Sequence, residues 1–144
     1  MDKMIFNNLI VNNNIWNNLS TAYLNNKIPN AYIFTGNAGI GKEAHAIEFA
    51  ALLNCKRPLE SNYSCGDCRS CLKIKRMCHE EINFILPTPS QKRKVKSSEL
   101  ELDSKITEEL KKEYKKKSDN PYYKIQLLNS NTIPISSIRN IKKK

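Results

Sequence analysis

Apolar residues recur at helical intervals in residues 14–26, and this spacing predicts an amphipathic helix. Its expected apolar face comprises Ile15, Trp16, Leu19, Ala22 and Tyr23. A short run of aromatic and β-branched residues at 31–35 is typical of a buried strand. Residues 42–54 are rich in alanine and predict a second helix. Because a glycine-bearing loop at 36–41 joins the strand to this helix, the order matches the start of an α/β nucleotide-binding domain.

The middle of the chain alternates between short elements and a polar segment. Residues 72–77 predict a short helix, and residues 82–86 predict a second buried strand that ends at Pro87. Residues 88–102 are polar and basic and show no period, as expected of an exposed insertion.

Two more helices are predicted in the last third of the chain. One covers residues 103–117 and has an apolar stripe of Ile106, Leu110 and Tyr114. The other is expected to begin after Ser136 or Ser137, whose hydroxyl would cap its N-terminus.

Positive charge is concentrated in the second half of the protein. The chain has 24 Lys and Arg against 14 Asp and Glu, and residues 92–144 hold 15 basic and 7 acidic side chains. This balance favours contact with nucleic acid or an acidic partner, and a solvated lysine-rich face explains it equally well. The residues that would form such a contact surface are Lys92, Arg93, Lys94, Lys96, Lys115, Lys116 and Lys117.

Hydropathy argues against a membrane protein. No stretch approaches the roughly 20 apolar residues of a membrane-spanning helix, and the N-terminus lacks the pattern of a signal peptide. We therefore expect a cytoplasmic protein with no membrane contact, in which metal binding is a better explanation of the five cysteines than disulfides are.

Four of the cysteines, Cys55, Cys65, Cys68 and Cys71, are spaced as metal ligands. Zinc takes four tetrahedral thiolate or imidazole ligands, and intervals of two residues let neighbouring thiolates reach one ion. The spacing predicts a structural zinc site with every coordination position filled by protein. Cys78 and His79 remain as alternative ligands. Reduced cysteines packed as small apolar residues are the competing explanation.

The glycine loop has the G-x-x-x-x-G-K core of a phosphate-binding P-loop, in the required position between a strand and a helix. Backbone N–H groups of such a loop form an anion nest, and the lysine reaches the β- and γ-phosphates. The next position is Ser or Thr in P-loop NTPases, where its hydroxyl binds Mg²⁺. This chain has Glu43 there, so we expect a degenerate loop that does not turn over ATP with Mg²⁺. Residual nucleotide binding stays open. The expected nucleotide-site residues are Gly36, Gly39, Gly41, Lys42 and Glu43.

Two segments together resemble the bacterial clamp-loader family of the DNA polymerase III holoenzyme. Residues 27–36 are similar to the family's approach to its P-loop, and residues 65–71, CGDCRSC, are similar to its zinc knuckle. The resemblance implies an α/β fold, namely a truncated P-loop (AAA+-like) parallel-sheet domain. It also implies a zinc module at 55–71 inserted into that domain, and a basic polar insertion at about 88–131 follows.

The family includes gamma/tau ATPase subunits and a delta-prime subunit that often carries a degenerate P-loop. Glu43 and the long insertion favour the delta-prime type. The resemblance then implies a non-hydrolysing subunit of the polymerase holoenzyme that helps to load the sliding clamp onto primed DNA. Its implied partners are the gamma/tau and delta subunits, with the clamp contacted indirectly and primed DNA as a further candidate.

Several family features are missing from these 144 residues. The acidic Walker B strand, the arginine-finger motif, the lid domain and the collar domain find no counterpart, so we expect a partial subunit without catalytic residues. Two alternatives stay open. One is a gamma/tau-type ATPase that tolerates Glu43, and the other is a zinc-knuckle protein that binds nucleic acid through its basic insertion.

Overall fold

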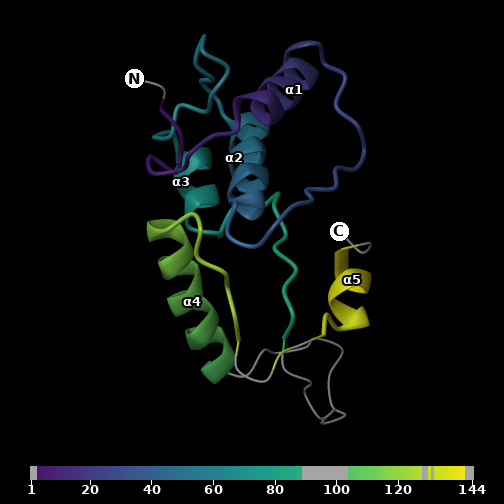
Figure 1. The fold of residues 1–144 in the computed structure, drawn as a ribbon. Helices are drawn as coiled ribbons and strands as arrows, with labels where there is room; N and C mark the ends of the chain where they lie inside the picture. Colours follow the sequence, from purple (N-terminus) through teal and green to yellow (C-terminus); the bar gives the residue numbers. More distant parts are fainter. Residues whose placement is uncertain (1–2, 89–103, 128–129, 131, 142–144) are drawn as a thin grey trace.

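The computed structural model has five helices in the part of the chain that it describes (Figure 1). The described residues are 3–88, 104–127, 130 and 132–141. The helices are α1 (Asn13–Leu24), α2 (Lys42–Asn54), α3 (Arg69–Lys75), α4 (Ser104–Asp119) and α5 (Ile135–Ile141). Within these residues no helix is long and apolar enough to cross a membrane. Residues 88–102, which were expected to form an exposed insertion, lie almost entirely outside the described residues.

Helix α1 forms where the sequence predicts it. It begins after Asn12, whose side-chain oxygen accepts a hydrogen bond from the N–H of Ile15 at 3.3 Å. Trp16 and Leu19 are buried against α2, but Ile15 is 41% exposed. The predicted apolar face was therefore too wide, because the stripe that meets α2 passes through Trp16 and Leu19 and leaves Ile15 at its edge.

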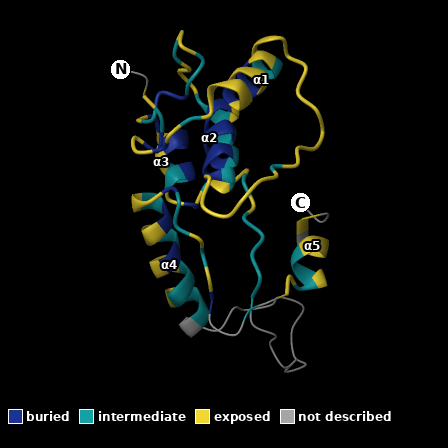
Figure 2. Cartoon of the chain, in the orientation of Figure 1, coloured by how far each residue is buried: buried dark blue, intermediate teal, exposed yellow. Residues whose placement is uncertain are grey.

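Helix α2 lies between α1 and α3 and is largely buried (Figure 2). It contributes to two apolar clusters. On one side, Phe49 and Leu52 pack with Trp16 and Leu19 of α1. The second and larger cluster comprises Ile5, Phe6, Leu9, Ala44, Ile47, Ala51, Cys65, Cys68, Cys71, Ile74 and Met77. Because α2 contributes side chains to both clusters, it connects them.

The loop before α3 is joined to α1 by an aromatic contact. The rings of Trp16 and Tyr63 stack with their centroids 5.0 Å apart and their planes 8° apart. Helix α3 then begins at Arg69, three residues before the prediction, because the sulfur of Cys68 accepts from the N–H of Cys71 and caps the first turn.

Helix α4 matches the predicted helix at 103–117, and the predicted apolar stripe is half-buried. Tyr114 of that stripe lies against Phe84, with ring centroids 6.3 Å apart. The prediction for α5 was wrong at its start, since the helix begins at Ile135 rather than after the serines. The carbonyl of Pro134 accepts from the N–H of Ser137, so proline supplies the entry to this helix.

The two predicted strands, 31–35 and 82–86, are not strands in the structure, and no strand occurs anywhere in the described residues. Both are extended segments (Figure 1). A strand requires a neighbour that satisfies its backbone N–H and C=O groups, and the described residues provide none. Ile33 is consequently 89% exposed, although its apolar neighbours suggested burial. The parallel sheet of the expected fold class is therefore not present in this part of the chain.

Candidate metal centre and glycine loop

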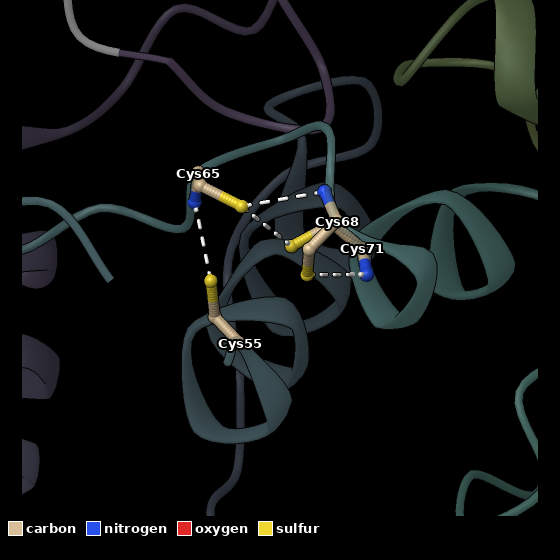
Figure 3. A group of neighbouring side chains, drawn as sticks. All are labelled: Cys55, Cys65, Cys68 and Cys71. Atoms are coloured by element: carbon tan, nitrogen blue, oxygen red, sulfur yellow. Dashed lines mark hydrogen bonds between the residues drawn. The ribbon is translucent and has the colours of Figure 1, made fainter. Parts of the chain in front are cut away.

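Four cysteine sulfurs converge at the junction of α2 and α3 (Figure 3). Cys55 directly follows α2, Cys65 lies in the loop, Cys68 precedes α3, and Cys71 lies in the first turn of α3. All four Sγ atoms lie within 4.8 Å of one another, and all four cysteines are free thiols. The spacing noticed in the sequence thus corresponds to one cluster in space.

Backbone N–H groups point at the sulfurs of this cluster (Figure 3). The N–H of Cys65 donates to Sγ of Cys55 at 3.3 Å, and that of Cys68 donates to Sγ of Cys65 at 3.3 Å. The N–H of Cys71 donates to Sγ of Cys68 at 3.5 Å. Backbone N–H donors suit a thiolate, which is the form of cysteine that binds metal.

The cysteines differ in how readily they lose a proton. Burial raises the pKa of the Cys68 thiol, but hydrogen bonds from the N–H groups of Cys71 and Lys56 and from neighbouring thiols outweigh it and lower the pKa to about 6. Burial raises the pKa of Cys65 and, more strongly, that of Cys71. The hydrogen bonds thus favour the thiolate of Cys68, whereas burial favours the protonated thiols of Cys65 and Cys71.

The donor set fits a zinc ion. Four sulfurs bound tetrahedrally at ~2.3 Å are about 3.8 Å apart, and Sγ of Cys65 and Cys71 are separated by 4.0 Å. A small contraction of the cluster would complete the coordination sphere. Because the protein supplies four thiols, no position is left for substrate or water, and the centre is suited to a structural role.

A buried carboxylate ties the cysteine loop to the rest of the fold. Glu48 of α2 is fully buried, and its carboxylate accepts from the N–H groups of Ile5 and Phe6 and from the hydroxyl of Ser64. Burial raises the pKa of Glu48, and these hydrogen bonds oppose the shift. Glu48 was not among the predicted site residues, although a glutamate one turn after Ala44 on the apolar face of α2 was a visible signal.

The two alternative ligands lie outside the cluster. Cys78 is exposed, and its thiol is directed to the carbonyl of Lys73. His79 shares a hydrogen bond of 2.8 Å with the hydroxyl of Ser70. Neither side chain belongs to the group of four sulfurs.

The glycine loop has an unusual backbone at three of its residues. Gly36, Gly39 and Gly41 have φ values of +141°, +82° and +81°, which side chains rarely allow. The ammonium of Lys42 folds back and donates to the carbonyl oxygens of Gly36 at 2.8 Å and Asn37 at 2.6 Å. The loop is therefore closed by its own lysine.

Glu43 pairs with a lysine that is far away in the sequence. Its carboxylate lies 2.9 Å from the ammonium of Lys117, at the end of α4. Lys117 was expected in the exposed basic surface, but it is only 2% exposed. That expectation was wrong because Lys117 continues the buried stripe of α4, one turn after Glu113. Lys92, Arg93, Lys94 and Lys96, which were assigned to the same surface, lie outside the described residues.

A hollow of about 490 Å³ lies beside the glycine loop. Its walls come from α1, the extended segment at 32–35, and the start of α2, with Lys42 and His45 among the lining residues. The Nε2 of His45 accepts from the N–H of Asn12 at 3.1 Å, and its Nδ1 lies 2.8 Å from the carbonyl of Gly41. This pattern requires the neutral ring with its proton on Nδ1, so His45 fixes the start of α2 to the start of α1.

Nearly the whole chain matches the model of one protein family. The family model for DNA polymerase III, delta subunit, matches residues 11–142. The DNA polymerase III subunit delta' of Pseudomonas aeruginosa is 37% identical over 62 residues, which are 43% of this chain and 19% of that protein. The DNA polymerase III subunit tau/gamma of Haemophilus influenzae is 36% identical over 67 residues, which are 46% of this chain and 9% of that protein. The chain thus spans less than a fifth of the length of these curated relatives, and no solved structure matches it.

Proposed function

Because the chain belongs to the DNA polymerase III delta subunit family, we propose that it acts in DNA replication as a delta-prime-like subunit of the clamp loader that does not hydrolyse ATP. The observation that carries this proposal is the family match over residues 11–142, which includes both the glycine loop and the cysteine cluster. The delta' and tau/gamma relatives each match by a similar margin, so the choice between the two types depends on the residues of the loop.

Two side chains of the loop favour the delta-prime type. In a working P-loop, the lysine binds phosphates and the following hydroxyl binds Mg²⁺. Here Lys42 is bonded to loop carbonyls, and Glu43 replaces the hydroxyl and is paired with Lys117. These contacts leave neither residue directed at a nucleotide, which is the arrangement expected of a subunit that supports an ATPase neighbour.

The proposed partners are the gamma/tau and delta subunits of the same cytoplasmic complex, with the sliding clamp contacted indirectly. In this assembly, the P-loop domain would present a surface to an ATPase neighbour instead of turning over nucleotide itself. Cys55, Cys65, Cys68 and Cys71 would hold one structural Zn²⁺ that orients α3 relative to α2.

Co-elution with gamma/tau and delta subunits from the same organism tests the assembly. We expect the chain to enter a stable complex with at least one of them on size-exclusion chromatography, and elution of the chain alone from every mixture would reject the proposal. A Cys78→Ser variant should co-elute as the parent does, because Cys78 is exposed and lies outside the cysteine cluster.

ATP turnover separates the delta-prime type from the gamma/tau alternative. The purified chain and its Lys42→Ala variant should both release phosphate at the rate of buffer. A steady rate in the parent that disappears in Lys42→Ala would show a working P-loop and favour the ATPase. Co-elution can succeed in either case, so the two measurements answer different questions.

A further inference from the structure

Lys117 is a buried lysine in a binding site made of oxygen atoms. Its ammonium donates to Oε2 of Glu43 at 2.9 Å and to the carbonyl oxygens of Pro121 and Tyr123, both at 2.8 Å. These three acceptors match the three N–H donors of an ammonium group. Lysine is almost never fully buried unless it is paired, because removing the charge from water costs several kcal/mol. The site is therefore built around a cation.

The residues that follow Lys117 also contact the segment just before α2. Segment 117–123, which we call the clasp, turns back at Pro121 so that Tyr122 reaches the glycine loop. The hydroxyl of Tyr122 accepts from the N–H of Ile10 at 2.8 Å. A Cβ on Gly41 would lie 3.1 Å from the ring of Tyr122, so the ring is packed on the last glycine of the loop.

The charges around the loop do not fit the metal–nucleotide complex that a working P-loop binds. In P-loop NTPases the position of Glu43 contributes a neutral hydroxyl to Mg²⁺, and the preceding lysine meets the phosphates. In this chain a carboxylate takes that position and is bonded to Lys117. Lys42 is bonded to carbonyls of its own loop. Both charges are thus engaged inside the chain.

We propose that Lys117 is a built-in cation of the glycine loop, which neutralises Glu43 and lets the clasp hold the loop in shape without nucleotide or metal. The inference rests on the proposed function, because it explains how a non-hydrolysing subunit keeps the shape of its P-loop domain. α4 and the clasp then hold the glycine loop through contacts within the chain itself.

Chemical rescue tests whether the site requires a cation. Lys117→Ala should lower the melting temperature by about 10 °C, since it leaves Glu43 and two carbonyls without their donor. Methylammonium chloride should restore much of the loss in Lys117→Ala, whereas sodium chloride at the same ionic strength should not. Lys115→Ala is the matched control, because Lys115 lies in the same turn of α4 and is exposed; it should melt near the parent and should not respond to methylammonium.

A double-mutant cycle covers the case in which Lys117→Ala does not fold. Glu43→Gln alters a side chain that is 57% exposed, so the variant should fold and melt below the parent. Lys117→Met in the Glu43→Gln background should cost less than Lys117→Met alone, because the two charges act as a pair. Additive losses would overturn the pairing, as would an unchanged melting temperature or the absence of methylammonium rescue in a folded Lys117→Ala.

Magnesium ATP is the last arm of the test. A ligand that binds the folded chain raises its melting temperature, so the parent should show no shift on adding Mg·ATP. A clear shift would overturn the inference, because the loop would then accept the complex that its charges should exclude. Failure of the chain to co-elute with clamp-loader subunits, with methylammonium rescue intact, would reject the proposed function and leave the role of Lys117 standing.

Discussion

Cys68 has two roles within a single side chain. Its sulfur caps the first turn of α3, and the same sulfur belongs to the cluster of four. A metal bound there would hold the cap, so the start of α3 and the metal centre are expected to form together. This coupling is typical of small structural zinc sites, in which the binding free energy contributes to folding.

Replacing Cys68 should therefore remove the metal. We expect the parent chain, prepared without chelators, to contain about one Zn²⁺ per molecule by elemental analysis. Cys68→Ser should contain much less than one, and Cys78→Ser should contain as much as the parent because Cys78 lies outside the cluster. A parent protein free of metal would refute the zinc site.

Glu113 makes the last turn of α4 sensitive to acid. Its carboxylate accepts from the hydroxyl of Tyr123 at 2.7 Å, the N–H of Gln126 at 3.2 Å, and the ammonium of Lys116 at 2.7 Å. Burial raises the pKa of Glu113, but these hydrogen bonds outweigh it and hold the pKa below its usual value. A carboxyl with a lowered pKa stabilises the folded state above its unfolded pKa, and this contribution is lost as the pH falls through the folded value.

Glu113→Gln should cost about 1–3 kcal/mol of unfolding free energy at neutral pH, since the charge-assisted hydrogen bonds are weakened. The difference from the parent should shrink as the pH falls below about 4.3, the usual pKa of glutamate. Denaturant titrations at several pH values measure this, and a difference that stayed constant down to low pH would contradict it. Glu108→Gln, at an exposed position of α4, is the comparison variant.

Residue-scale features were predictable only where the signal is local. Three of the four clustered cysteines lie within seven residues, so spacing alone placed them together. Glu43 and Lys117 are 74 positions apart, and nothing in either neighbourhood shows that the chain folds to join them. Glu48 lies between these cases, because its helical position was visible but its partners were not.

Helix α2 is the element on which the other contacts depend. It separates the two apolar clusters and contributes side chains to both. It also begins at the glycine loop and ends just before Cys55, so the loop and the cysteine cluster lie at its two ends. Tilting or fraying this one helix would therefore disturb both sites.

Leu52→Ala should destabilise the protein by about 2–5 kcal/mol, because Leu52 is completely buried between α1 and α2 and truncation leaves a cavity. The neighbouring Leu53 is 38% exposed, so Leu53→Ala should change the unfolding free energy by only about 0.5 kcal/mol or less. Denaturant unfolding followed by circular dichroism measures both, and equal losses in the two variants would contradict this arrangement of α2.

Helices were easier to predict than strands for a physical reason. A helix satisfies its hydrogen bonds within one segment, so α1, α2 and α4 could be identified from periodicity and composition. A strand depends on a partner that may be far away in sequence. Residues 31–35 and 82–86 have the composition of strands, but they find no such partner among the described residues.

At the scale of the molecule, positive charge is the dominant property. The net charge is +10, and most of the excess follows residue 91. Burial of Lys117 removes one lysine from the accessible surface, whereas Lys111, Lys112, Lys115 and Lys116 of α4 are exposed. A nucleic acid that met this charge would be bound through its phosphates, because no aromatic ladder is interleaved with the lysines.

Fluorescence anisotropy with a primed-template DNA can separate a DNA-binding surface from a solvated one. A contact with about four phosphates should be indifferent to sequence and weaken about 10²-fold between roughly 50 and 200 mM salt. Neutralising Lys92, Arg93, Lys94 and Lys96 should flatten this dependence. Neutralising the four exposed lysines of α4 removes an equal charge and shows whether that helix takes part in the contact. Absence of binding in the parent at physiological salt would identify a solvated face.

The stacked pair of Trp16 and Tyr63 makes tryptophan fluorescence a reporter of how the cysteine loop packs on α1. Trp16 is the one tryptophan in the sequence, and it is 2% exposed. Its ring joins α1 to the loop between Cys55 and Cys65, so light emitted by a single indole reports whether that loop is docked. The emission of Trp16 should be blue-shifted in the native protein. It should move to longer wavelength when a chelator removes metal bound by the four cysteines. If the spectrum is unchanged while the metal is lost, the loop stays docked on α1 without it.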